Sequence, residues 1–191
     1  MNITSFLIYC MIATFTPGPT NIVILSTVHH LGAKKAMKYS YGATIGFGLL
    51  LVISAALNTM LVTIIPKILI VMQIIGSMYM FYLAYQIYKR DTSKPTVNQP
   101  ATLMSGFLMQ FLNPKVILFS MTVIPSFILP NYNAVPEVAT SIIAITLIGF
   151  SAFSTWVLFG TIFKEFLQKY DKTVNVLMTL FLAYAAIMIW I

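Results

Sequence analysis

Charged residues are scarce in this sequence. Only 8% of the 191 residues are charged, whereas about a quarter of the residues in a soluble domain are. Hydrophobic residues make up 59% of the chain. A water-soluble fold of this length could not bury so much apolar surface, so the composition excludes a soluble enzyme or binding domain and indicates a membrane protein.

Cysteine is equally scarce. A single residue, Cys10, excludes an intrachain disulfide, a dithiol redox centre and a cysteine-rich metal site, and its place in an apolar run favours a packing role. The chain also lacks a phosphate-binding glycine loop with lysine, an HExxH motif and a GxSxG motif. We therefore expect no metal, no cofactor and no enzyme of a soluble class.

Six apolar runs fill most of the chain. A membrane-spanning helix needs about 20 apolar residues, and the runs cover residues 3–30, 40–65, 68–88, 101–129, 138–163 and 173–191. The N-terminus lacks the basic segment of a cleavable signal peptide, so the first run is expected to be retained. The turn between the second and third runs is expected at Pro66-Lys67. The sequence predicts an all-α membrane protein with six transmembrane helices in one domain, residues 1–191.

The basic residues predict an orientation. Nine of them lie in alternate loops on one side of the membrane, and Lys67 lies alone on the other; the nine are Lys34, Lys35, Lys38, Lys89, Arg90, Lys94, Lys164, Lys169 and Lys172. Because basic loops stay in the cytoplasm, both termini are expected outside. The same placement, in short clusters between apolar runs, argues against a nucleic-acid partner despite the net charge of +7.

Two helix-breaking motifs occupy matching places in the two halves of the chain. A polar linker separates residues 1–95 from 96–191, with three runs on each side, and halves with an odd number of helices insert with opposite topology. Pro17-Gly18-Pro19 interrupts the first run and Asn113-Pro114-Lys115 the fourth. Proline removes a hydrogen-bond donor and clashes with the preceding turn. The sequence thus predicts two inverted three-helix repeats, with helices 1 and 4 broken.

Broken helices indicate a solute-binding and gating site. Backbone freed within a membrane is tolerated where protein buries it or where it lines a wet cavity, and it can bind a solute's charges. A simple kink is the alternative. The residues expected at the site are Pro17, Gly18, Pro19, Asn21, Tyr79, Asn113, Pro114 and Lys115. Lys115 could attract a substrate carboxylate, or residues 101–112 could lie along the cytoplasmic membrane surface with Lys115 reaching the headgroups.

No aspartate or glutamate lies in the interior of an apolar run. A pocket for a cationic solute ordinarily contains a buried carboxylate, as does a carboxylate proton relay. Neutral, zwitterionic solutes are therefore favoured, and any proton coupling has to use another group. His29 and His30 could indicate metal binding or proton transfer. Adjacent positions do not share a helix face, however, so both are expected at the surface near the headgroups.

Two further patterns concern helix faces. Gly42, Gly46 and Gly48 form a small-residue stripe that includes a GxxxG motif, which suits close packing within the subunit or in a homodimer. Tyr79 and Tyr82 share one face of the third run and could line a polar path, although a membrane-interface role is the alternative for the tyrosines that follow them.

Several of these motifs together resemble the LysE/RhtB family of bacterial amino-acid exporters. They are Phe15-Thr16-Pro17-Gly18-Pro19, Gly76-Ser77-Met78-Tyr79 and Phe111-Leu112-Asn113-Pro114-Lys115, and length and hydropathy also match over the whole chain. The resemblance implies a single-component exporter in the bacterial inner membrane, driven by the proton-motive force, with amino acids or similar small metabolites as substrate. It also points to both broken motifs as functional positions. A membrane-embedded enzyme and a passive channel are the alternatives.

Overall fold

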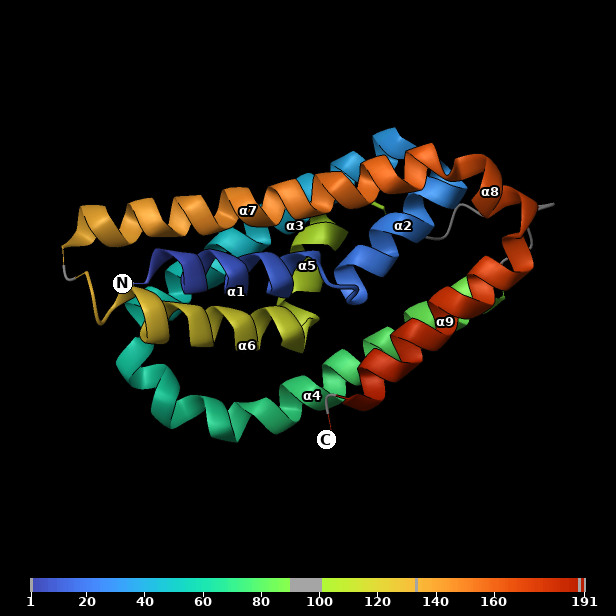
Figure 1. Ribbon diagram of the computed structural model, residues 1–191. Coiled ribbons are helices and arrows are strands. Elements are labelled where there is room, and N and C mark those ends of the chain that lie inside the picture. The colour runs from blue at the N-terminus through green and yellow to red at the C-terminus, as the bar shows by residue number, and fades with distance from the viewer. Residues whose placement is uncertain (1, 90–100, 133, 189, 191) are drawn as a thin grey trace.

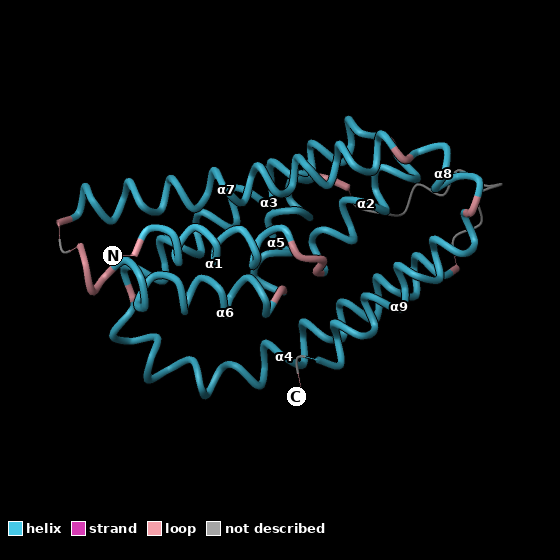
Figure 2. Tube along the Cα trace, in the orientation of Figure 1, coloured by secondary structure: helices cyan, strands magenta, loops and turns pink. Residues whose placement is uncertain are grey.

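The computed structural model describes residues 2–89, 101–132, 134–188 and 190. Within these ranges the chain is helical apart from short connections, and it contains no strand (Figures 1 and 2). The helices are α1 (Ile3–Phe15), α2 (Pro19–Leu31), α3 (Ala33–Ala56), α4 (Asn58–Tyr88), α5 (Leu103–Leu112), α6 (Pro114–Val123), the π-helix η1 (Ile124–Ile128), α7 (Val135–Ile162), α8 (Lys164–Lys169) and α9 (Asp171–Met188). The prediction of an all-helical fold is confirmed.

Two helices, α3 and α7, are individually long and apolar enough to cross a membrane. Two further crossings result if α1 with α2, and α5 with the segment Pro114–Ile128, each count as one bent span. Four crossings can thus be assigned by length and composition in the described part of the chain. The arrangement with six spans stays a prediction.

Both helix breaks lie where the prolines predict them (Figure 2). The first falls between Phe15 and Pro19 and bends the chain by 48°, and the second falls at Asn113 and bends it by 68°. In each case a proline occupies the first turn of the following helix, where its missing N–H costs no helical hydrogen bond. The predicted interruptions are confirmed.

The predicted turn at Pro66-Lys67 is wrong. The connection between α3 and α4 lies at Leu57, and α4 runs without interruption from Asn58 to Tyr88. A proline within a membrane helix bends it without ending it when neighbouring groups satisfy the freed carbonyl. The turn at Leu57 uses non-helical dihedral angles (φ −108°, ψ 16°) at a residue that carries no glycine or proline signal.

Helices α3 and α5 cross at backbone contact. A Cβ atom added at Gly42 would lie 1.8 Å from the carbonyl oxygen of Leu103, and one at Gly106 would lie 2.0 Å from that of Tyr39. No residue larger than glycine fits at such distances. The glycine stripe therefore packs within the subunit, which is one of the two roles that the sequence allowed.

Helices of the first half of the chain pack on helices of the second half. Helix α3 of the first half packs on α5 of the second, α7 of the second half packs on α1 and α2 of the first, and α4 packs along α9 (Figure 1). Two apolar clusters fill the interior. One surrounds Ile24 and Leu182, and the other surrounds Phe47 and Ile145.

Candidate functional site

The second helix break carries a lysine that contacts the first helix break. Lys115 lies in the first turn of α6, and its Nζ donates hydrogen bonds to the carbonyl oxygen of Thr16 at 2.9 Å and to Thr16 Oγ1 at 2.8 Å. The Thr16 carbonyl has no helical partner, because the chain leaves the helix after Phe15 and residue 19 is proline. Lys115 therefore points into the protein between the two breaks. This geometry places the ammonium group of Lys115 at the first break, beside the carbonyl oxygen of Thr16.

Side chains satisfy the other carbonyls that the first break frees. Asn21 Nδ2 donates to the carbonyl oxygens of Thr14 at 3.1 Å and Thr16 at 2.9 Å. Trp156 Nε1 of α7 donates to the carbonyl oxygen of Phe15 at 3.2 Å. The Oδ1 atom of Asn21 is buried and has no partner among the described residues. The site thus retains a buried acceptor for a ligand's donor.

A buried hydroxyl joins the two broken segments. Thr20 Oγ1 accepts hydrogen bonds from Asn113 Nδ2 at 2.9 Å and from Gln110 Nε2 at 3.3 Å. The Oδ1 atom of Asn113 in turn accepts from the backbone N–H of Lys115 at 3.1 Å and caps α6. Thr20 and Gln110 were not predicted. A polar residue one helical turn before Asn113, in an otherwise apolar run, is the signal that could have identified Gln110.

Gly18 lies within the first break, next to Lys115. It is the N-cap of α2 and provides no side-chain cap, so N–H groups in the first turn of α2 lack an intrahelical acceptor. A Cβ atom at this position would lie 3.1 Å from Lys115 Cδ and 3.3 Å from Lys115 Nζ. With glycine here Lys115 approaches the backbone closely, whereas a Cβ atom would displace the lysine side chain by a few tenths of an ångström. The positive end of the α2 dipole lies beside the lysine ammonium.

A groove of about 760 Å³ opens onto the two breaks. That volume lies within the range of about 300–1,000 Å³ typical of small-molecule sites. The groove is lined by Tyr9, Ala13, Pro17, Gly18, Pro19, Ile22, Met80, Asn113, Pro114, Lys115, Leu118, Phe119, Thr122, Phe181, Tyr184 and Ala185. Lys115 is the charged residue in this lining, and the described lining contains no carboxylate.

Most of the predicted site residues come together in this region. Six of them line the groove: Pro17, Gly18, Pro19, Asn113, Pro114 and Lys115. Asn21 lines an adjoining cavity of about 30 Å³, which is large enough for a water molecule. Tyr79 lies elsewhere. It is partly buried in α4 against the cluster around Ile24, and its ring lies 6.3 Å from that of Tyr82.

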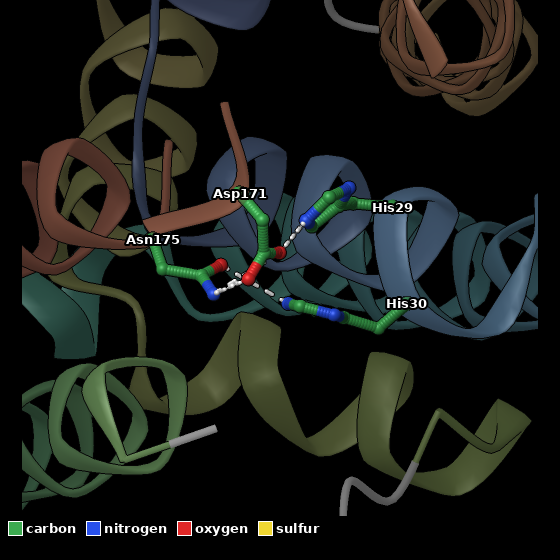
Figure 3. A network of polar contacts seen from close by, with 4 residues as sticks. All are labelled: His29, His30, Asp171 and Asn175. Atoms are coloured by element: carbon green, nitrogen blue, oxygen red, sulfur yellow. Dashed lines mark hydrogen bonds and ion pairs between the residues drawn. The ribbon is translucent and has the colours of Figure 1, made fainter. Parts of the chain in front are cut away.

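The opposite end of α2 carries the two histidines (Figure 3). His29 is only 4% exposed and faces Asp171 at the start of α9. The prediction that both histidines lie at the surface is therefore wrong for His29. A partner 142 residues away covers it, and no local sequence pattern could show that contact.

Comparison with known proteins gives a consistent result. Residues 11–191 match the family model described as LysE type translocator. Proteins named cysteine/O-acetylserine efflux protein, from Escherichia coli strain K12 and from Shigella flexneri, are 28% identical over 189 residues, which cover 98% of this chain and 97% of each relative. No solved structure matches.

Proposed function

The chain belongs to the LysE family of translocators, and on that premise we propose that it exports small neutral amino acids across the bacterial inner membrane, driven by the proton-motive force. It is a multi-pass membrane transporter and not an enzyme. Given the names of its relatives, cysteine and O-acetylserine are the first substrates to test. Both are small zwitterions near neutral pH.

Lys115 is the observation that carries this proposal. An ammonium group has three donors, and two of them bind Thr16. The third is available to a substrate carboxylate in the groove. The first-turn N–H groups of α2, beside Gly18, are positioned to share the same carboxylate, because the end of a broken helix binds anions in this way.

The substrate's own ammonium group has a complementary acceptor. Asn21 Oδ1 is buried and has no partner in the described part of the chain, and Asn21 lines the small cavity together with Gly18 and Lys115. Leu118 and Phe119 provide apolar surface for a short side chain. Lysine and arginine are disfavoured as substrates, because the described lining offers their second positive charge no carboxylate and places Lys115 nearby.

The packing of helices from one half of the chain on helices from the other half supports two inverted repeats. In this arrangement the first repeat consists of α1–α2, α3 and α4, and the second of α5–α6, α7 and α9. The second helix of each repeat packs on the broken helix of the other, and the third helices pack together, as a two-fold relation requires. Export then proceeds by rocking of the repeats about the two breaks, which alternately exposes the groove to each side.

Transport by the purified protein in lipid vesicles tests the function. Vesicles loaded with labelled cysteine or O-acetylserine are expected to exchange label across the membrane and to accumulate it against its gradient when a pH gradient is imposed. If the protein exchanges neither cysteine nor O-acetylserine, the proposed substrate class is wrong. Flux that only dissipates the substrate gradient, with no response to an energised membrane, would favour a passive channel.

A further inference from the structure

The far end of α2 and the start of α9 share a network of polar side chains (Figure 3). His29 Nε2 lies 2.5 Å from Asp171 Oδ1, and His30 Nε2 lies 3.1 Å from Asn175 Oδ1. Asn175 Nδ2 donates to both carboxylate oxygens of Asp171, each at 3.4 Å. These residues lie outside the groove lining, and the binding of a substrate in the groove gives them no role.

The helices joined by this network are two of the five that line the groove, which also has residues of α1, α4 and α6 in its lining. Helix α2 begins at the first break, where Pro19 lines the groove, and carries His29 near its other end. Helix α9 begins at Asp171, and its later residues Phe181 and Tyr184 line the groove from the other side. A packed helix moves as a rigid element, so a change in the contact between His29 and Asp171 changes the separation of the groove walls.

The pair can hold an exchangeable proton. Histidine is the side chain that ordinarily gains and loses its proton between about pH 5 and 8. The Asp171 carboxylate lies against the Nε2 atom of His29, one of its two protonation sites. The buried Nδ1 atom of His29 has no partner among the described residues, and a second N–H there would be unsatisfied. A proton held by this pair therefore lies between His29 Nε2 and Asp171 Oδ1, the polar contact that joins α2 to the start of α9.

Other titratable groups lie around the pair. His30, on the same helix, has its ring centroid 4.2 Å from that of His29. The neighbouring elements carry Lys34, Lys35, Lys38, Lys164, Glu165, Lys169 and Lys172. Within the described parts of the chain, none of these seven makes an ion pair with His29 or Asp171, whereas the two make one with each other. The Asp171 carboxylate is thus held by His29 and by Asn175, and His30 is also close to it.

We propose that His29 and Asp171 form the proton-binding site that couples export to the proton-motive force, an inference that rests on the proposed function. With the proton bound, imidazolium and carboxylate hold the start of α9 against α2. When His29 gives its proton to water, the pair changes from neutral to a net charge of −1 and holds α9 less firmly. The groove then opens at that end, so proton release and substrate entry occur together.

Two transport assays on the same vesicles distinguish a role of the His29–Asp171 pair in proton coupling from a role in helix packing. Exchange of labelled cysteine at equal pH measures binding and alternation, and accumulation in a pH gradient measures coupling. The variants Asp171→Asn and His29→Gln are expected to keep exchange and to lose gradient-driven accumulation by about tenfold or more. The control Glu165→Gln, which removes a carboxylate from the exposed surface of α8, is expected to behave as wild type in both assays.

The outcomes are distinguishable. Wild-type accumulation in Asp171→Asn and His29→Gln would overturn the coupling role, and so would loss of exchange by variants that reach the membrane, because that loss shows a packing role. Absence of exchange by the wild-type protein would contradict the proposed function instead. Calorimetric titration of the wild-type protein with cysteine, in buffers of different ionisation enthalpy, is expected to show proton release on binding. Equal heats in all buffers would overturn the inference even if no variant inserts.

Discussion

Replacing Lys115 by methionine removes the ammonium group and keeps an unbranched side chain of similar length. The Thr16 carbonyl loses the donor at 2.9 Å but retains Asn21 Nδ2, also at 2.9 Å, so the break is expected to persist. What disappears is the donor for a substrate carboxylate. Lys115→Met therefore separates a role in binding from a role in holding the fold.

The expected magnitude follows from the strength of a charged hydrogen bond. Such a bond contributes about 1.5–3 kcal/mol, and each ~1.4 kcal/mol corresponds to a factor of ten in affinity. Since Lys115 is partly exposed, the lower part of the energy range applies. We expect the KM for cysteine export to rise about 10- to 40-fold, with a smaller change in kcat, because the interaction is made mainly with the bound ground state.

The assay is initial-rate uptake into inverted vesicles over a range of cysteine concentrations, normalised to the protein in the membrane. Lys35→Met is the matched control, since Lys35 is exposed on α3 and the substitution is the same. A KM within twofold of wild type for Lys115→Met would refute the assignment of Lys115 to the substrate carboxylate. An equal rise in KM for Lys35→Met would show that net charge, and not the groove, is responsible.

Three further results are expected. Gly18→Ala adds a Cβ atom 3.1 Å from Lys115 Cδ, so the lysine must shift, and cysteine export measured in vesicles falls while the protein level stays normal. Gly42→Ala forces α3 away from the Leu103 carbonyl, and the thermal unfolding midpoint of the purified protein falls, whereas Gly48→Ala, which meets only the Thr146 side chain at 3.3 Å, has a smaller effect. Reporter fusions are expected to place both termini outside the cytoplasm, and a cytoplasmic signal from either end would refute the inverted arrangement.

The helix breaks could be read from the sequence because the effect of proline is local. Pro17, Pro19 and Pro114 each act on the turn that contains them. The same rule failed at Pro66, where the backbone stays helical and the chain turns nine residues earlier at Leu57. Proline marks a place where a helix can end, and packing against other helices decides whether it does.

The contacts that build the site could not be read in this way. Lys115 meets Thr16 across 99 positions, and Asn113 meets Thr20 across 93. Inverted repeats predicted that the two breaks are related, but the identity of the paired atoms depends on how the helices cross. Tyr79 shows the converse. Its helical spacing with Tyr82 was real, yet that face of α4 does not reach the groove.

The crossing of α3 and α5 also has a consequence for biosynthesis. As the chain enters the membrane, the glycine face of α3 is made about sixty residues before the Leu103 carbonyl that it contacts. The closest backbone contact of the first half of the chain is made with α5 of the second half. The first half therefore stays incompletely packed in the lipid until α5 has been inserted. Helix α4 waits longer still for α9, which is the last of the described helices to be synthesised. Assembly is therefore expected to follow completion of synthesis, and truncation before α5 leaves a substrate for membrane proteases.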